Sequence, residues 1–400
     1  MRTELIQMAK IWRQSPKWIK WGWLLGGMAC LSARMIRRRP AILVIFSGSL
    51  GDGLLFTGAL RQIRLEKQAH KIILLTSFRA YPVLERCPYA DVVLAPPMGA
   101  GFSRQMMRMM QAIRVFSRSY ELVLCPNAVQ GEPDVNMAEL VSAQRRVLME
   151  WGTTLLFSEG GRGVAPSGES TSKLHEIDRI LFFLSVAGFN DARTREDIWP
   201  ELYATDSERA KAIVDVDTIR SRVPGVLVIA LCPGVRFKQK DWGKSNYIEL
   251  IHRLAQTRPV GVLLLGGLDD KPVMDDIVAG ICSIDGIMWL NKTGQCGIQA
   301  AAAMIEQADL CIGNDTFGLH AAIVVKTPSV VMMWGGDNER WAPWGDPRRH
   351  GMVRSCDQSC FGCQGKCLWP EFRCMTSITV DDALGAVLDL LEVVGDRPFH

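Results

Sequence analysis

The sequence predicts an α/β protein built from two doubly wound domains. Short runs rich in Val, Ile and Leu alternate with longer amphipathic segments, which is typical of buried parallel strands joined by crossover helices. This alternation occurs twice along the chain. With 400 residues, of which 48% are apolar and 22% charged, the chain is long enough for two buried cores. The composition excludes a disordered or fibrous protein.

The strands of the two halves define the predicted domains. In the first half the strand candidates are Ala41–Phe46, Ile72–Thr76, Asp91–Leu94 and Glu121–Cys125. In the second half they are Val226–Leu231, Val260–Leu265, Ile287–Leu290, Asp309–Ile312 and Ser329–Met333. We therefore expect domains over residues 40–200 and 201–377, followed by a closing helix and tail over residues 378–400. Ligands bind beyond the carboxyl ends of such strands, so we expect a cleft between the domains.

Residues 1–39 form a separate basic segment. They hold nine Lys and Arg residues against Glu4 alone, a charge of +8, whereas the whole chain carries +4. The remaining residues are thus mildly acidic, which argues against nucleic-acid binding. The longest uncharged stretch, Trp21–Ala33, has 13 residues, too few for a membrane-spanning helix of about 20. Arg34 follows directly, unlike the cleavage site of a secretory signal.

Four tryptophans lie among the basic residues of this segment: Trp12, Trp18, Trp21 and Trp23. This pattern favours an amphipathic segment that lies in an anionic membrane interface. The alternatives are a leader without structure and a helix docked on the protein's own surface. Seven cysteines scattered among apolar residues are typical of a reduced, cytosolic protein. We therefore expect a cytoplasmic protein that is peripheral on the inner face of the cell membrane.

A glycine-rich turn follows the first strand. Residues 47–53 read S-G-S-L-G-D-G and lead into a helix expected over Leu54–Glu66. The spacing lacks the G-x-G-x-x-G of dinucleotide-binding proteins and the Lys-Ser/Thr pair of a P-loop, which disfavours a dehydrogenase or an ATPase. Asp52 is a candidate general base, and the alternative is an ordinary helix cap. Ser49, Gly51 and Gly53 would lie beside it, on the side of the group from which the base would take a proton.

Three strand ends of the second half carry candidate ligand-binding residues. The first is followed by the cations Arg236, Lys238 and Lys240, which suit a diphosphate but also suit a solvated loop. The second is followed by Gly266 and Gly267 and then by Asp269 and Asp270, adjacent carboxylates that suit ribose hydroxyls but also a simple turn. The third leads into a helix N-terminus that suits an anion. Its candidate residues are Asn314, Asp315, Thr316, Gly318 and His320. A lone helical histidine is more often structural.

Together these segments resemble glycosyltransferase family 9, the ADP-heptose:lipopolysaccharide heptosyltransferases. Five motifs occur in the order of that family: S-L-G-D before a helix, P-G-x-R-x-x-x-K-x-W, L-G-G, G-N-D-T followed by a histidine, and E-R-W-x-P-W-G. Each motif alone is weak, but five in the right order are specific. The resemblance runs from about residue 41 to residue 394 and leaves out the basic segment.

The resemblance implies a GT-B architecture, with two Rossmann-like domains facing each other across a cleft. It implies an inverting transfer of heptose or a related sugar from a nucleotide diphosphate donor, such as ADP-heptose, to a lipopolysaccharide or other lipid-linked glycan, with no cofactor required. Asp52 takes the position of the family's base, and Arg236 and Lys240 those of its arginine and lysine. The alternative is a sugar-nucleotide-binding scaffold without turnover, but the presence of both Asp52 and Lys240 favours an enzyme.

Two departures from the family pattern concern the donor. The family usually has Ser or Thr where this chain has Val235, and Gly where it has Phe317, so the resemblance leaves the donor sugar open. The only D-x-D motif, residues 215–217, lies in the polar stretch around residues 200–224 that precedes the first strand of the second half. A diphosphate bridged by a metal ion is therefore not predicted.

Five cysteines form C-x₃-C-x₂-C-x₃-C-x₆-C near the end of the second domain. They are Cys356, Cys360, Cys363, Cys367 and Cys374. The first four could hold structural zinc or an iron–sulfur cluster, since both accept four thiolates. Disulfides and free thiols are the alternatives, because five is an odd number and the protein is expected in the cytosol.

Overall fold

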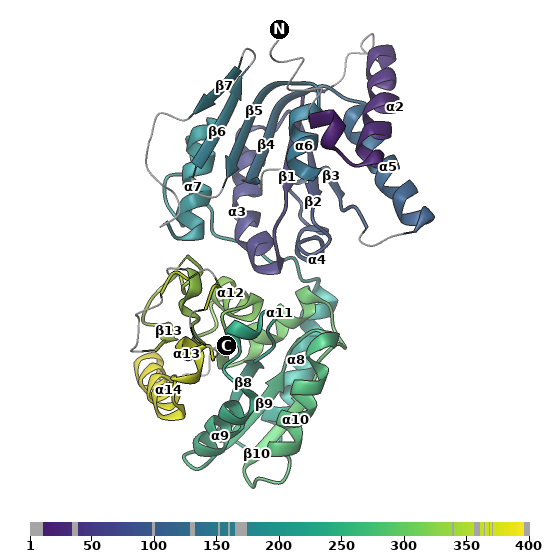
Figure 1. Cartoon of the computed structure of the whole chain (residues 1–400). Helices are drawn as coiled ribbons and strands as arrows, with labels where there is room; N and C mark the ends of the chain where they lie inside the picture. Colours follow the sequence, from purple (N-terminus) through teal and green to yellow (C-terminus); the bar gives the residue numbers. More distant parts are fainter. Residues whose placement is uncertain are drawn as a thin grey trace. The chain divides into compact units, whose positions relative to one another are not determined.

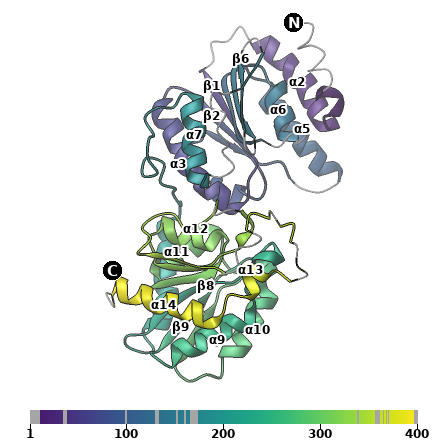
Figure 2. The same cartoon turned by 60° about the vertical axis from the view of Figure 1, so that its left-hand side comes forward.

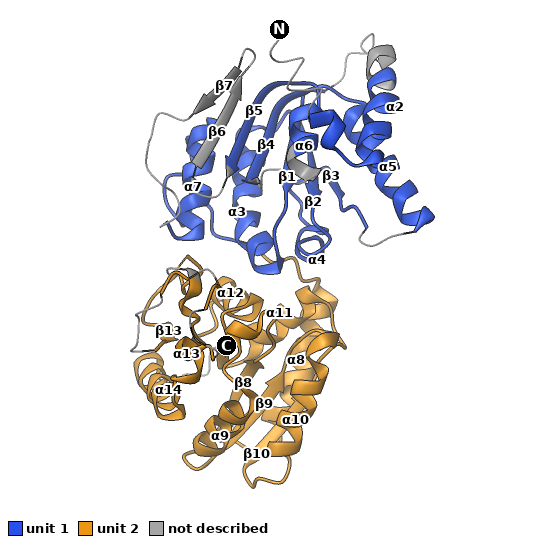
Figure 3. Cartoon of the chain, in the orientation of Figure 1, with its two compact units in different colours: residues 1–201 blue, residues 202–400 orange. Residues whose placement is uncertain are grey.

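The computed structural model describes residues 11–33, 39–97, 101–128, 133–150, 153–158, 161–164, 174–337, 340–355, 361–363, 365–367, 369 and 371–395. The chain divides into two compact units, residues 1–201 and residues 202–400 (Figure 3). Each unit has its own sheet covered by helices (Figure 1). Among the described residues no helix is both long enough and apolar enough to cross a membrane.

Unit 1 contains a seven-stranded sheet of order β3-β2-β1-β4-β5-β6-β7. Strands β1 to β5 pair in parallel, whereas β6 and β7 add an antiparallel extension. The predicted strands correspond to β1 to β4, and β5 to β7 were not predicted. The strand bounds are β1 Ala41–Phe46, β2 Lys71–Thr76, β3 Val92–Leu94, β4 Tyr120–Ala128, β5 Ala143–Glu150, β6 Thr153–Ser158 and β7 Gly161–Val164.

Helices cover both faces of this sheet. Figure 2 shows α3 and α7 on one face and α2, α5 and α6 on the other. The second group packs on alternate strand residues such as Leu43, Ile45 and Val123, as expected for a strand that is buried on both faces. The helix bounds are α2 Lys17–Ala33, α3 Leu50–Glu66, α4 Tyr81–Leu84, α5 Phe102–Phe116, α6 Pro133–Leu140 and α7 Glu176–Ala187.

Helix α2 is part of the folded unit. Ile19 is 0% exposed and belongs to the core of unit 1. A Cβ built at Gly22 would lie 2.3 Å from Ala112 Cβ, and one at Gly26 would lie 2.7 Å from Phe116 Cβ. The two glycines therefore let α2 pack directly against α5. The described residues of the basic segment therefore form a helix docked on the protein's own surface, which was one of the alternatives for this segment. Residues 1–10 and 34–38 lie outside the described residues.

We expect Ile19→Ala to lower the free energy of unfolding by about 2–5 kcal/mol, because it leaves a cavity in a closed core. Leu24→Ala is the matched control, since Leu24 lies on the exposed face of the same helix. Its expected effect is within about 0.5 kcal/mol. Urea unfolding of both variants measures the difference, and equal midpoints would show that α2 is not docked in solution.

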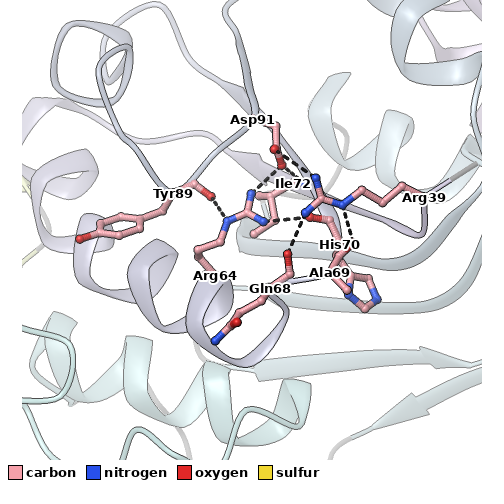
Figure 4. Close-up of polar contacts among 8 residues, drawn as sticks. All are labelled: Arg39, Arg64, Gln68, Ala69, His70, Ile72, Tyr89 and Asp91. Carbon is pink, nitrogen blue, oxygen red and sulfur yellow. Dashed lines mark hydrogen bonds and ion pairs between the residues drawn. The ribbon is translucent and has the colours of Figure 1, made fainter.

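Two arginines, Arg39 and Arg64, connect the segment just before β1 with the rest of unit 1 (Figure 4). Arg39 Nε donates to Ala69 O at 2.5 Å, and its Nη1 lies 3.8 Å from Asp91 Oδ1. Arg64 Nη2 donates to Asp91 Oδ2 at 2.5 Å, and the Ile72 N–H donates to the same oxygen at 2.7 Å. Burial by itself raises the pKa of Asp91, but these donors lower it below its ordinary value. Arg39, counted above with the basic segment, is thus bound within the fold.

Unit 2 contains a six-stranded parallel sheet of order β10-β9-β8-β11-β12-β13. Strands β8 to β12 match the five predicted strands, and β13 was not predicted. The strand bounds are β8 Leu227–Cys232, β9 Val260–Leu264, β10 Ile287–Asn291, β11 Leu310–Asn314, β12 Ser329–Met332 and β13 His350–Val353.

The helices of unit 2 form two layers. Residues of α9, α10 and α14 share a hydrophobic core with the sheet, and α11 packs against both α8 and α12. The predicted closing helix is α14, which begins after Thr379. The Thr379 Oγ1 accepts the Asp382 N–H at 3.1 Å and so forms a capping box. The helix bounds are α8 Asp206–Arg220, α9 Lys244–Ala255, α10 Lys271–Ile281, α11 Ile298–Gln307, α12 Phe317–Val324, α13 Arg373–Thr376 and α14 Val380–Val394.

Candidate functional site

In unit 1, Asp52 lies in the first turn of α3. The Ser49 N–H donates to Asp52 Oδ2 at 2.6 Å, so the half-buried carboxylate also caps the helix. The helix begins at Leu50 and not at the predicted Leu54. The turn before it is closely packed, and its glycines do not prevent helix formation there. Gly51 and Gly53 therefore lie inside the helix and not in the preceding loop.

The turn between β1 and α3 is closely packed. A Cβ at Gly48 would lie 2.6 Å from the Phe46 ring and 2.8 Å from Asp52 Cβ. Ser77, which follows β2, donates from its Oγ to Gly48 O at 2.5 Å. These contacts hold Asp52 at the carboxyl edge of the sheet, the edge at which ligands of such folds bind.

In unit 2, Asn314 joins the loop after β8 to the end of β11. Its Nδ2 donates to Pro233 O at 2.8 Å, and its Oδ1 accepts the Trp242 N–H at 3.3 Å. Trp242 is itself anchored, because its Nε1 donates to Ile378 O at 2.8 Å. Asn314 is fully buried and fixes both ends of the loop between Pro233 and Trp242. It is a positioning residue in this structure, and a direct donor contact stays a prediction.

Lys240 is paired with a buried carboxylate. Its Nζ donates to Asp315 Oδ2 at 2.6 Å, and the side chains of Lys240 and Asp315 are 15% and 1% exposed. Burial raises the pKa of Asp315 above its ordinary value, although the charge of Lys240 acts in the opposite direction. The ammonium also lies 5.2 Å from the centroid of the Trp334 ring. Asp315 and Trp334 thus fix the position of the lysine charge, and the sequence offered no signal for Trp334.

Of the two adjacent carboxylates after β9, Asp270 is the one held in the turn. The Gly267 N–H donates to Asp270 Oδ2 at 2.8 Å. A Cβ at Gly234 would lie 2.4 Å from Asp270 Cγ, and one at Gly266 would lie 2.8 Å from Asp270 Oδ2. Burial raises the pKa of Asp270, and the neighbouring charge of Asp269 adds to this effect. Asp269, by contrast, is exposed. Asp270 lies close to Gly234 of the loop after β8 and to Gly266 of the loop after β9, so it connects these two loops.

The start of α12 carries the remaining candidates. Thr316 is the N-cap residue and is half-buried. A Cβ at Gly318 would lie 2.7 Å from Cys232 Cβ, so this glycine allows the helix to pack on β8. His320 is buried, and the Trp344 Nε1 donates to its Nδ1 at 3.4 Å. Of these three residues, Thr316 lies at the anion-favouring end of the helix.

Two further cations lie on the loop after β8. Arg236 and Lys238 are exposed, and the Arg236 guanidinium lies 5.2 Å from the centroid of the Phe237 ring. The structure therefore gathers Lys240, Arg236 and the N-terminus of α12 at one edge of unit 2. This arrangement of positive charge suits a bound diphosphate.

The cysteine-rich segment is described only in part. Cys356 and Cys360 lie outside the described residues, and Cys363, Cys367 and Cys374 form no disulfide. No group of three potential metal ligands occurs among the described residues. A Cβ at Gly365 would lie 3.2 Å from Gln239 Nε2, so the segment contacts the basic loop. Structural zinc or an iron–sulfur cluster stays a prediction.

Comparisons with known proteins point to one family. A sequence model of glycosyltransferase family 9 (heptosyltransferase) matches residues 175–367. Lipopolysaccharide heptosyltransferase 3 of Escherichia coli (strain K12) is 23% identical over 305 residues, 74% of this chain and 82% of that protein. Lipopolysaccharide heptosyltransferase 2 of Salmonella typhimurium is 25% identical over 147 residues, 36% of this chain and 40% of that protein. The latter match thus spans less than half of that relative.

Solved structures share the fold. The glycosyl transferase family 9 protein of Veillonella parvula DSM 2008 has a TM-score of 0.67 at 14% identity, over 88% of this chain and 98% of that one. The E. coli heptosyltransferase WaaC with ADP-2-deoxy-2-fluoro heptose has a TM-score of 0.56 at 14% identity, over 89% of this chain and 100% of that one. The predicted α/β fold class with GT-B architecture is thereby confirmed.

Proposed function

We propose that this chain, as a glycosyltransferase of the heptosyltransferase-like family 9 type, transfers heptose or a related sugar from an ADP-linked donor. The proposed acceptor is lipopolysaccharide or another lipid-linked glycan, and the transfer inverts the anomeric carbon. The observation that supports donor binding best is the Lys240 ammonium, which the buried Asp315 holds at 2.6 Å beside the start of α12. A neutral ligand would not need a cation fixed in this way.

In the proposed reaction, unit 1 activates the acceptor and unit 2 holds the donor. Asp52 accepts the proton of the acceptor hydroxyl while its oxygen attacks the anomeric carbon. The bond between that carbon and the diphosphate breaks, and the nucleoside diphosphate leaves with the bonding electrons. Lys240 and Arg236 stabilise the negative charge that grows on the diphosphate, together with the N–H groups at the start of α12. The hydrogen bond from the Ser49 N–H holds the Asp52 carboxylate in one orientation.

The donor identity is supported by the relatives. The E. coli and Salmonella relatives are lipopolysaccharide heptosyltransferases, and WaaC was solved with an ADP-heptose analogue. Their names also suggest an acceptor that is anchored in a membrane. We therefore propose that this chain works in the cytoplasm, at the inner face of the cell membrane.

The test of this function is a ligand panel followed by a transfer assay. ADP and ADP-sugars should raise the melting temperature more than UDP, GDP and their sugars, because a ligand at 100 times its dissociation constant stabilises the folded state by about 2.7 kcal/mol. The best donor is then incubated with a lipid A–core acceptor, and the product anomer is read by NMR. Transfer with inversion supports the proposal. Stabilisation without transfer would favour the scaffold, and no stabilisation would exclude an ADP-linked donor.

A further inference from the structure

The face of α2 that points away from the core of unit 1 is apolar. Trp21, Leu24, Leu25 and Met28 recur at a spacing of three and four residues, which places them on one side of the helix. All four are exposed, Trp21 by 54% and Met28 by 59%. Ile19 lies on the opposite side and is buried. The helix is therefore docked by one face, and the apolar side chains of its second face are exposed.

Helix α5, which packs against α2, repeats this pattern. Met106, Met107 and Met110 are exposed on the side opposite Ala112, and Phe102 is 82% exposed at the start of the helix. Large exposed apolar side chains on two helices that pack against each other are unusual for a soluble surface. We call these residues, with those of the exposed α2 face, the α2–α5 surface.

The charged residues of α2, α5 and their flanking residues have one sign. Residues 11–33 and 101–118 contain no Asp or Glu. Their basic residues are Arg13, Lys17, Lys20, Arg104, Arg108, Arg114 and Arg118. Arg13, Lys17, Arg104 and Arg114 are exposed. The Lys20 ammonium lies 5.2 Å from the centroid of the Trp12 ring. An apolar surface on helices whose charged residues are all basic complements an anionic lipid interface, where Trp inserts among the headgroups.

We propose that the α2–α5 surface binds unit 1 to an anionic bilayer. The inference rests on the proposed function only for its setting, a lipid-linked acceptor, since the binding itself needs no catalysis. A second copy of the chain fits the surface less well, because a twofold interface would bring two acid-free, basic surfaces together. The membrane contact therefore includes α5 of the folded unit, well beyond the predicted basic segment of residues 1–39.

The test is vesicle sedimentation of the full-length protein at several salt concentrations, with phosphatidylcholine vesicles that contain or lack phosphatidylglycerol. Two apolar variants are compared, W21S/L24S/M28S on α2 and M106Q/M107Q/M110Q on α5. The matched control is I213S/V214S, which removes exposed apolar side chains from α8 of unit 2. Each of the first two variants should bind anionic vesicles at least tenfold more weakly, and the control should bind as wild type.

The charge contribution is tested by R104Q/R114Q, with K211Q/R222Q as the control for two exposed cations elsewhere. The first should lower binding to anionic vesicles and reduce its salt dependence, since the attraction of each basic residue to anionic headgroups is screened by salt. Circular dichroism and ADP binding, measured on every variant, separate a loss of membrane binding from a loss of folding or of donor binding. Wild-type binding by the α5 variant would overturn the proposal. So would a wild-type dimer that the apolar variants dissociate.

Discussion

Asp52→Asn is expected to lower the turnover of sugar transfer by about 10²–10⁴-fold, because it removes the group that accepts the acceptor proton. The amide keeps the size of the side chain, and its oxygen can still accept the Ser49 N–H that caps α3. The affinity for ADP should be nearly unchanged, since the proposed donor contacts all come from unit 2. Initial rates at saturating donor and acceptor, together with ADP titration calorimetry, measure the two effects.

The control for Asp52 is Asp382→Asn at the start of α14. Asp382 occupies the same position in its helix and accepts the Thr379 N–H at 3.0 Å. Both variants lose a carboxylate that favours a helix N-terminus, at a cost of about 0.3–1 kcal/mol each. Only Asp52→Asn should lose turnover. An activity within threefold of wild type would leave Asp52 with the role of a helix cap.

Lys240→Ala is expected to have two large effects, one on donor binding and one on stability. A hydrogen bond to a charged group contributes about 1.5–3 kcal/mol, so ADP should bind about 10-fold to 150-fold more weakly. Asp315 would remain buried without its partner, which typically costs about 3–5 kcal/mol of stability. Lys238→Ala is the matched control, because Lys238 lies in the same turn and is exposed.

The stability loss of Lys240→Ala should depend on pH in a defined direction. Lys240 lowers the pKa of Asp315, so its removal raises that pKa further above the ordinary value. A carboxyl with a raised pKa in the folded state binds a proton more tightly there than in the unfolded chain. The destabilisation should therefore be greatest at high pH and shrink as the pH falls through the folded-state pKa of Asp315. Urea unfolding at pH 8 and pH 5 measures this change.

A double variant separates the two effects. K240A/D315N removes the unpaired charge, so it should recover much of the stability and lose its dependence on pH. It should not recover ADP affinity, because the cation is still missing. If ADP binds K240A/D315N as tightly as wild type, Lys240 does not hold the diphosphate.

Most strands of both sheets could be predicted because a buried parallel strand is a local pattern. Runs such as Ala41–Phe46 and Val260–Leu264 are apolar at every position, as is typical of strands that are buried on both faces. The antiparallel end of the unit 1 sheet could not be predicted. In β5, Arg145 and Arg146 interrupt the apolar run, and they fit because Arg145 donates to Val186 O and Ala187 O at the end of α7.

The candidate site shows the same division. The sequence was enough to predict Asp52, Arg236 and Lys240 as site residues, because charged residues and glycines that follow a predicted strand can be recognised from the order of residues alone. The positions of Asp270 and Trp334 could not, since each depends on a neighbour that is far away in the chain. Trp334 follows β12, yet it lies against Lys240 of the loop after β8.

By itself the sequence determined the two α/β units, the order of their motifs and the basic character of the first segment, because composition and periodicity are properties of neighbouring residues. The tertiary structure alone decided which face of each element is covered. Gly22 and Gly26 carry no pattern of their own, and they matter because Ala112 and Phe116 approach them. Lys240 is likewise one cation among several until the buried Asp315 fixes its charge. Packing between distant segments decides both features, because the free energy of a buried group depends on the solvent that it loses and on the partner that it gains.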